Sequence, residues 1–289
     1  KNNSIIQTQT TRTFSSRKSR IMLNISIVLY HPDWQQVAEL TQVFLQSNKV
    51  EHIYWIDNSP VAENSLPIRS PKISYRHNVR NIGYGAAHNI AIRESIYDDI
   101  PYHLVINLDI IVDNQVIETL LAFMDQHLEV GMVMPKVLYP NGEQQYLCKL
   151  LPTPLDVFGR RFLPNSWIKR RNDRYEMRSS GYDKMMNVPY LSGCFMLLRT
   201  QAIQKARLFD ERFFMYPEDM DLTRRIHRDY LTVYFPYVSV IHNHEHASYK
   251  SLKMMWVHIV NMCRYFNKWG WFVDKERDAF NAMAIKEYL

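Results

Sequence analysis

The sequence predicts an α/β fold in which a mostly parallel central sheet is flanked by helices on both faces. Short runs rich in β-branched residues alternate with longer segments whose apolar residues recur at helical spacing. Repeated β-α units of this length are typical of a parallel sheet. The 289 residues, 46% of them apolar, are enough to bury one large core or two smaller ones, which favours a globular enzyme over a disordered chain.

The alternation begins at residues 24–30, where a β-branched run predicts the first strand. Residues 34–47 follow as an amphipathic helix, because Val37, Leu40 and Phe44 recur at helical spacing. The rest of this half repeats the pattern. We expect strands at residues 51–56, near Ile73, at 103–107 and at 131–137, and helices at residues 86–97 and 114–128.

The regular pattern is lost between residues 139 and 187, where Pro, Gly and charged residues prevail. Eight basic residues lie between Arg160 and Lys184, and we predict a long loop or lid here instead of a second domain. The pattern then returns. We expect strands at residues 189–199, 231–235 and 238–242, a helix within 209–229 and a final helix at 250–267.

The positive charge is concentrated at the start of the chain. The first twenty residues contain five basic residues and no acid, which leaves a net charge of only +1 on the rest of a chain whose total is +6. This distribution argues against a nucleic-acid-binding protein. Residues 1–21 are interpreted as a disordered basic leader or extension, with Met22 as the expected natural start.

The cysteines and the hydropathy pattern indicate where the protein works. Three widely spaced cysteines without a Cys-x-x-Cys pair favour neither a disulfide framework nor a structural zinc site, and a reducing cytoplasm fits best. No uncharged apolar stretch of about 18 residues is present, so any membrane contact is expected to be peripheral.

Several polar residues follow predicted strands, where open α/β sheets bind their ligands. Asp57 could accept a hydrogen bond from a pyrimidine, or could simply form an Asx turn. Gly83 and Gly85 open a helix whose amides could approach a diphosphate, although the pattern fails as a dinucleotide fingerprint. Asp109 follows an apolar run and could hold a divalent cation, or could end the strand in a turn.

The densest cluster of acids and aromatics lies in residues 209–225. Glu218 and Asp219 follow Pro217 and are expected in the first turn of a helix, where helix capping alone would explain them. Asp221 and Arg225 have the spacing of an i,i+4 ion pair. Further on, three imidazoles alternate at positions 242, 244 and 246. We interpret His242 as a partner of Asp109 on a cation, and surface histidines as the alternative.

These segments, taken in order, resemble glycosyltransferase family 2, in particular its bacterial rhamnosyltransferase-like members that build surface polysaccharides. The most specific stretch is residues 209–226, FDERFFMYPEDMDLTRRI, which is similar to the acceptor-side motif that ends in a Glu-Asp pair. Residues 242–251, HNHEHASYKS, and residues 265–277, YFNKWGWFVDKER, resemble the C-terminal part of close relatives. The likeness covers the chain from about Asn24 onward, apart from the variable middle loop.

The resemblance implies a GT-A fold and a single domain over residues 22–289. Its parts would be a nucleotide-sugar-binding half (22–138), a variable loop or lid (139–187) and an acceptor and catalytic half with the C-terminal helix (188–289). The roles that it implies fall into four groups. Donor contacts would come from Tyr30, Asp57, Asn81, Gly83, Gly85 and Asn107; metal contacts from Asp109 and His242; catalysis from Asp219 and Glu218; acceptor contacts from Ser192, Gly193 and Tyr216.

The implied reaction is inverting sugar transfer from a nucleoside-diphosphate donor, dTDP- or UDP-linked, to a glycan or lipid-linked glycan. Asp219 would act as base, and Mg²⁺ or Mn²⁺ would stabilise the departing diphosphate. Asn107 stands where the family often has the first Asp of Asp-x-Asp, and an amide oxygen is a weaker ligand than a carboxylate. A catalytically idle nucleotide-sugar-binding module is the alternative, and a dinucleotide-dependent oxidoreductase is disfavoured because Gly83-x-Gly85 follows the third strand instead of the first.

The C-terminal helix carries an aromatic stripe that has two interpretations. Trp256, Trp269, Trp271 and Phe272 are expected to pack in the core, as helical aromatic stripes usually do. The alternative is that these aromatics and neighbouring basic residues rest on the inner face of the cell membrane.

Overall fold

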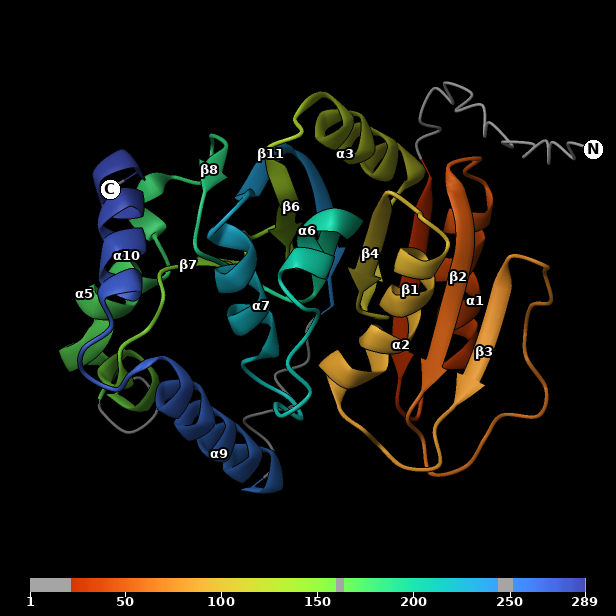
Figure 1. Ribbon diagram of the computed structural model, residues 1–289, viewed down its shortest axis with the longest axis horizontal. Coiled ribbons are helices and arrows are strands. Elements are labelled where there is room, and N and C mark those ends of the chain that lie inside the picture. Colours follow the sequence, from red (N-terminus) through yellow and green to blue (C-terminus); the bar gives the residue numbers. More distant parts are fainter. Residues whose placement is uncertain (1–21, 160–163, 244–251, 289) are drawn as a thin grey trace, which may run out of the picture.

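The computed structural model describes residues 22–159, 164–243 and 252–288 (Figure 1). Its centre is a nine-stranded sheet in the order β3-β2-β1-β4-β10-β6-β11-β5, with β8 pairing to β11. Strands β1 to β4 pair in parallel, and so do β6 and β11, whereas β10 runs antiparallel to both neighbours. The predicted α/β architecture with a mostly parallel sheet is confirmed. Residues 1–21, including the predicted leader, lie outside the described residues.

The strands of the main sheet have the following bounds: β1 Leu23–Leu29, β2 Val50–Asp57, β3 Ile73–His77, β4 Tyr102–Ile106, β5 Ile110–Ile111, β6 Val130–Leu138, β8 Met186–Asn187, β10 Phe195–Arg199 and β11 Leu231–His242. A separate pair is formed by β7 (Cys148–Lys149) and β9 (Tyr190–Leu191). The α-helices are α1 Trp34–Leu45, α2 Tyr84–Tyr97, α3 Asn114–Gln126, α5 Asn165–Tyr175, α6 Thr200–Lys205, α7 Glu218–His227, α9 Leu252–Trp269 and α10 Lys275–Tyr288.

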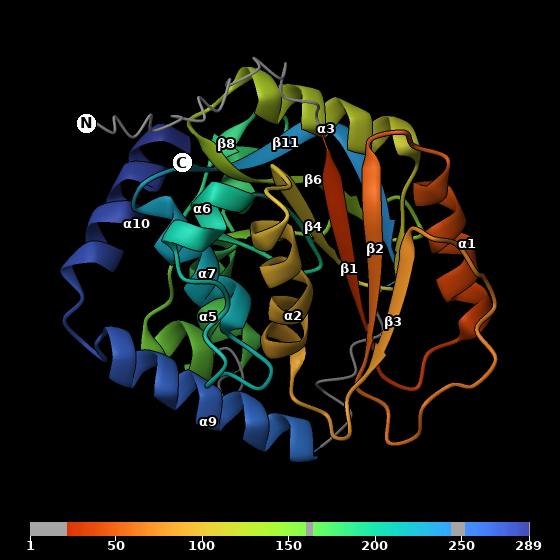
Figure 2. The same ribbon diagram turned by 45° about the vertical axis from the view of Figure 1, so that its right-hand side comes forward.

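The sheet is buried between two layers of helices (Figure 2). Helices α1 and α3 cover one face, and α2, α6 and α7 cover the other. The central strands are apolar on both sides, as expected for a sheet without a solvent-facing surface; all five residues of β4 and of β10 are buried. Among the helices of the described residues, none combines the length and the hydropathy that a membrane crossing requires.

The structure differs from expectation between residues 139 and 187, which contain regular elements instead of one long loop. Helix α5 lies here, together with β7, β8, the π-helical turn η1 (Leu155–Gly159) and the 3₁₀ turn η2 (Arg178–Ser180). Five of the eleven residues of α5 are charged, which hides its apolar period in the sequence. Its Ile168 and Tyr175 are nevertheless buried, at 5% and 8% exposed.

Two further expectations near the C-terminus were wrong. The two short strands expected at 231–235 and 238–242 are a single strand, β11, with an irregularity between Phe235 and Ser239. The single helix expected to end at residue 267 is α9, which continues to Trp269, and a second helix, α10, follows it. Gly270 separates them at a φ of 110°, a conformation that favours glycine.

A row of hydrogen-bonded polar side chains is buried between α2 and the sheet. Ser26 Oγ lies 2.6 Å from His88 Nδ1 and 2.8 Å from His103 Nε2, and His103 Nδ1 lies 2.7 Å from Ser95 Oγ. Both histidines are completely buried. Burial disfavours the charged imidazolium and lowers the pKa of His103 to about 3; it also lowers the pKa of His88.

We expect the two histidines in this buried row of side chains to make the protein less stable in mild acid. The unfolded chain protonates His103 near pH 6.5 and the folded chain only near pH 3, so the stabilisation is present above pH 6.5 and is lost as the pH falls. Between pH 7 and pH 5 this single group should account for about 2 kcal/mol. Urea unfolding of the wild type and of His103→Gln at both pH values measures the difference; an equal pH dependence would contradict the assignment to His103.

Candidate active site

The candidate site lies at the carboxyl ends of β1, β2 and β4, beside the first turns of α2 and α7. The arrows of β2 and β3 point to the lower edge of the molecule in Figure 1, where α2 begins. Most of the residues singled out in the sequence lie on the segments that meet there.

Asp57 ends β2 and is 1% exposed. Its Oδ1 accepts a hydrogen bond from the Ser59 amide (2.8 Å), which is the Asx turn foreseen as one interpretation. Its Oδ2 accepts a hydrogen bond from the Tyr75 hydroxyl (2.7 Å), and burial raises the pKa of Tyr75 to about 12. Tyr30, just after β1, is 56% exposed, and its ring contacts that of His31 edge-on, with ring centroids 4.5 Å apart. Tyr30 is therefore open to contact with a nucleobase, whereas both carboxylate oxygens of Asp57 already accept hydrogen bonds from the protein.

Gly83 and Gly85 allow another segment of the chain to approach α2 closely. Gly83 has a φ of 91°, and a Cβ there would lie 2.3 Å from the backbone oxygen of Phe214. A Cβ on Gly85 would lie 2.8 Å from the Cβ of Phe209. The Gly83 amide donates to Asn81 Oδ1 (2.9 Å), and the Tyr84 amide donates to Phe214 O (3.0 Å). The backbone amides of Gly83 and Tyr84, which could have bound a diphosphate, therefore already donate hydrogen bonds within the protein. A nucleotide sugar could bind these two amides only by breaking those hydrogen bonds.

Tyr84 connects the two halves of the site. Its hydroxyl lies 2.8 Å from Asn107 Oδ1, at the end of β4, and 2.8 Å from the backbone oxygen of Gly193, in the turn between β9 and β10. Burial raises the pKa of Tyr84, so the hydroxyl keeps its proton and can donate. The Asn107 amide donates to Cys194 O (3.0 Å), which holds the same two segments together.

Asp109 and His242 meet because β5 pairs with the end of β11, where Ile110 lies opposite His242. His242 Nε2 lies 3.3 Å from Asp109 Oδ1. On the other side of the imidazole, Nδ1 lies 3.0 Å from Gln145 Oε1. The Gln145 amide nitrogen donates to the backbone oxygens of His242 (2.9 Å) and Leu138 (3.4 Å), so its oxygen faces Nδ1 and that nitrogen carries the proton.

This arrangement fits a divalent cation. The Nε2 lone pair of a neutral His242 and the carboxylate of Asp109 face one another, and both donor types suit Mn²⁺ or Mg²⁺. Asp109 is 35% exposed at its side chain, so the pair is open to solvent and substrate on one side. Within the described residues no group of three or more His, Cys, Asp or Glu side chains is arranged to hold a metal. Further ligands would therefore come from Asn107, water or phosphate oxygens.

Glu218 and Asp219 form the first turn of α7 but lie in different surroundings. Asp219 Oδ2 accepts hydrogen bonds from the Gly193 amide (2.9 Å) and the Tyr190 hydroxyl (3.3 Å), and Oδ1 accepts one from the Met220 amide (2.8 Å). Glu218 is 5% exposed, and its Oε2 has no hydrogen-bond partner among the described residues. Burial and the neighbouring Asp219 raise the pKa of Glu218 to about 8. Burial also raises the pKa of Asp219, whereas its three hydrogen-bond donors favour the ionised form. The two carboxyl groups therefore differ in that Asp219 is the one with donors for a negative charge.

The expected acceptor residues have structural contacts of their own. Gly193 binds Asp219, and a Cβ on Gly193 would lie 2.9 Å from the Asp219 Cβ, so only glycine brings its amide this close. Ser192 precedes it in the same turn. The Tyr216 ring packs edge-on against His258 of α9, with ring centroids 5.5 Å apart.

Helix α7 is held in place by buried charges on its opposite side. Asp221 is completely buried and binds Arg225 (2.7 Å), Lys268 (2.6 Å) and the Trp269 indole nitrogen (2.8 Å). The predicted Asp221–Arg225 pair is therefore present, within a larger network. The packing expectation holds for Trp269 and Trp271, which belong to a second hydrophobic cluster, but not for Trp256 and Phe272, which are 63% and 82% exposed.

Three residues of the site had no signal in the sequence: Tyr84, Gln145 and Tyr190. Each acts by a hydrogen bond to a residue distant in the sequence, and no spacing rule connects such partners. Gln145 lies in a polar stretch without periodicity, and only the fold brings it to His242.

Comparison with solved structures supports the fold. The chain resembles GalNAc-T7 crystallised with UDP, GalNAc and Mn²⁺ (TM-score 0.54, 12% identity), covering 78% of this chain and 44% of that one. It also resembles residues 1–349 of S. aureus TarS (TM-score 0.51, 14% identity; 76% of this chain and 60% of that chain covered). A third similar structure is the mannosyltransferase PcManGT from Pyrobaculum calidifontis with GDP-Man and Mn²⁺ (TM-score 0.52, 11% identity; 86% and 65% covered). These neighbours establish a GT-A fold.

Sequence comparison extends the likeness to a bacterial enzyme. The chain is 26% identical over 246 residues to the N-acetylglucosaminyl-diphospho-decaprenol L-rhamnosyltransferase of Mycobacterium tuberculosis, covering 78% of both proteins. The family model described as glycosyl transferase family 2 matches residues 37–207, more than half of the chain. That match includes Asp57, the glycines of α2, Asp109 and Gly193, and with the GT-A sheet it establishes that this chain belongs to glycosyl transferase family 2, as a rhamnosyltransferase-like member.

Proposed function

We propose that the chain transfers a sugar, with inversion, from a dTDP- or UDP-linked donor to a hydroxyl of a glycan or lipid-linked glycan. The observation that carries this proposal is the environment of Asp219, a carboxyl group held by three hydrogen-bond donors at a site that also presents Asp109 and His242. The mycobacterial relative, whose name describes rhamnosyl transfer to a diphospho-decaprenol-linked sugar, supports rhamnose and a lipid-linked acceptor.

In this reaction Asp219 removes the proton of the acceptor hydroxyl as the oxygen attacks the anomeric carbon. A single base on the acceptor side requires no covalent intermediate, and direct displacement inverts the configuration. Tyr190 and the Gly193 amide hold the carboxylate in place, and neutral Glu218 avoids a second negative charge beside it.

On the donor side, Tyr30 would stack on the base and Asp57 would accept a hydrogen bond from it. Asn81, Gly83 and Gly85 would line the ribose and the diphosphate, with Asn107 close to the cation. Asp109 and His242 would hold Mg²⁺ or Mn²⁺, which supplies positive charge to the departing diphosphate. Two of the similar structures contain Mn²⁺, which supports this assignment.

Asp109→Ala is expected to weaken Mn²⁺-dependent binding of the nucleotide by about tenfold or more, because the carboxylate that lies 3.3 Å from His242 Nε2 is removed. Glu118→Ala, which removes an exposed carboxylate on α3, is the control. Titration calorimetry with UDP and dTDP, with and without Mn²⁺, measures the effect. Unchanged metal dependence in Asp109→Ala would remove this residue from the site.

The donor is best identified by a screen. The purified chain is incubated with UDP-, dTDP- and GDP-sugars in the presence of Mn²⁺, and released nucleoside diphosphate is measured. Turnover of one dTDP- or UDP-sugar is expected, with dTDP-rhamnose as the first candidate. Nucleotide-sugar binding without hydrolysis or transfer under any condition would instead identify an idle binding module.

We also propose that the reaction belongs to bacterial surface polysaccharide synthesis at the cytoplasmic face of the cell membrane. The support is the lipid-linked substrate in the name of the mycobacterial relative and the exposed aromatics near the C-terminus.

A further inference from the structure

Helix α5 has an exposed face whose composition is unusual for a solvated surface. Trp167 is 78% exposed, and Arg170 and Arg174 follow it at i+3 and i+7, so the three side chains share one side of the helix. Ile168 and Tyr175 anchor the other side in the core. The helix therefore presents an indole and two guanidinium groups outward.

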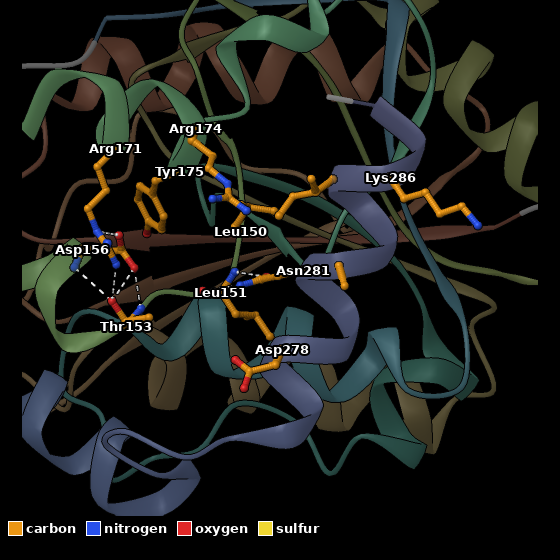
Figure 3. Close-up of a pocket in the computed structure, with 12 residues that line it drawn as sticks. Leu150, Leu151, Thr153, Asp156, Arg171, Arg174, Tyr175, Asp278, Asn281 and Lys286 are labelled. Atoms are coloured by element: carbon orange, nitrogen blue, oxygen red, sulfur yellow. Dashed lines mark hydrogen bonds and ion pairs between the residues drawn. The ribbon is translucent and has the colours of Figure 1, made fainter.

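The cations of this face are not neutralised by the protein. Lys169, Arg170 and Arg174 are exposed and make no ion pair among the described residues. Arg171 and Arg174 both line the cavity of about 500 Å³ shown in Figure 3, and at one side of it Arg171 binds Asp156 (2.5 Å) and Thr153 (2.8 Å). That cavity separates α5 from α10, and the pairing of Arg171 fixes α5 against the turn η1.

The turn η1 contacts both α5 and the turn between α9 and α10. Phe158 of η1 stacks on Trp271, with ring centroids 6.4 Å apart and planes 14° apart. Leu155 on η1 is 50% exposed, and Phe272 and Val273 in the turn are 82% and 77% exposed. In Figure 1, α5 and this turn both lie on the left of the molecule. We define the basic aromatic face as Leu155, Trp167, Lys169, Arg170, Arg174, Phe272, Val273 and Lys275.

We propose that the basic aromatic face docks the protein onto the surface of an anionic phospholipid bilayer. Exposed Trp, Phe, Leu and Val side chains enter the interface between headgroups and acyl chains, and unpaired Lys and Arg side chains contact lipid phosphates. The charge of the face argues for a bilayer as the partner. Its cations surround exposed apolar side chains, and this combination complements an acidic lipid surface better than it complements an apolar groove on another protein.

The docking proposal rests on the proposed function. A lipid-linked acceptor is held in a bilayer, so an enzyme that uses such an acceptor has a reason to bind the bilayer surface. The turn that carries Phe272 and Val273 leads directly to Asp274, which binds Arg224 of the catalytic helix α7 at 2.6 Å. The membrane-facing turn is therefore joined to the helix that holds Asp219.

The test is co-sedimentation of the full chain with vesicles in the absence of donor and acceptor. Phosphatidylcholine vesicles are compared with vesicles of equal phosphatidylcholine and phosphatidylglycerol, and binding is expected only to the latter and to weaken with added salt. Neutralising two cations, in Arg170→Gln/Arg174→Gln, should lower the partition coefficient about 30-fold, since each basic residue contributes about 1 kcal/mol at such a surface.

The matched control is Lys49→Gln/Arg69→Gln, which removes the same charge near the opposite edge of the sheet and should bind as the wild type does. Trp167→Ala retains every cation and should lower binding about tenfold through its apolar contribution. Circular dichroism and thermal unfolding verify that each variant is folded.

The proposal is overturned if the wild type binds neither vesicle, or if the Arg170/Arg174 variant binds no more weakly than the control. Binding to soluble polyphosphate with no binding to vesicles would overturn it too, and would assign the face to a soluble acidic polymer. Because neither donor nor acceptor is present, failure of the docking proposal is distinguishable from failure of the proposed transfer reaction.

Discussion

Asp219→Asn is expected to lower the rate of sugar transfer by about 10³-fold while leaving donor affinity within about threefold of the wild type. The amide oxygen of Asn can still accept hydrogen bonds from the Gly193 amide and the Tyr190 hydroxyl, so the turn should keep its geometry. What the variant loses is the ability to take a proton at neutral pH. Released nucleoside diphosphate measures the rate, and calorimetric titration measures donor binding.

Glu218→Gln is the matched variant, because it changes the adjacent carboxyl group in the same way. Glu218 is protonated below a pH of about 8, and Gln resembles the protonated form in shape and charge. We therefore expect transfer at pH 7 to stay within about tenfold of the wild type. If Asp219→Asn turned over at the wild-type rate and Glu218→Gln did not, the two roles would have to be exchanged.

The same assignment predicts a difference between pH profiles. Because burial raises the pKa of Glu218 to about 8, Glu218 gains a negative charge beside Asp219 as the pH rises through that value. The rate of the wild type should therefore change as the pH rises through about 8. In Glu218→Gln the neighbour stays neutral, and the profile should lack this step. A step of equal size in both enzymes would show that another group titrates there.

The order of the main strands and helices up to residue 138 could be predicted from the sequence, and the charged residues proposed for the site were singled out from it. Asp57 and Asp109 follow apolar runs, and strand ends in an α/β sheet are where ligands bind. The pairing of Asp109 with His242 was an interpretation of the chemistry of the two side chains, supported by the family resemblance, and no sequence pattern predicted it. The structure explains it by the pairing of β5 with β11, and a strand of two residues is too short to produce a pattern.

Helix α5 shows why other parts could not be predicted. Its sequence, NSWIKRRNDRY, contains few apolar residues, so the 3.6-residue period is carried by Ile168 and Tyr175 alone.

The glycines at the start of α2 illustrate a different limit. Gly83 and Gly85 were expected to open a helix and to let a diphosphate approach its first amides. They do open α2, but the close neighbour that the structure shows is the segment of Phe209 and Phe214. A sequence indicates that a small residue is required and does not name what approaches it.

Arg224→Met is expected to destabilise the protein by about 3–5 kcal/mol, the usual cost of leaving one partner of a buried ion pair alone. Arg224 is 1% exposed, binds Asp274 (2.6 Å) and Glu276 (2.8 Å), and stacks on Trp269 with its guanidinium 4.0 Å from the ring centroid. Met preserves much of the side-chain volume, so the loss would come mainly from the buried carboxylate of Asp274.

Arg228→Met is the control for this prediction, because Arg228 lies one turn further along α7 and also binds Glu276, at 2.5 Å. Its side chain is 45% exposed, so water replaces the lost contact and a change below about 1 kcal/mol is expected. Urea unfolding measures both variants. Adding Asp274→Asn to Arg224→Met should cost less than the sum of the single changes, since the stranded charge is removed. Strict additivity would mean that Arg224 and Asp274 do not act as a pair.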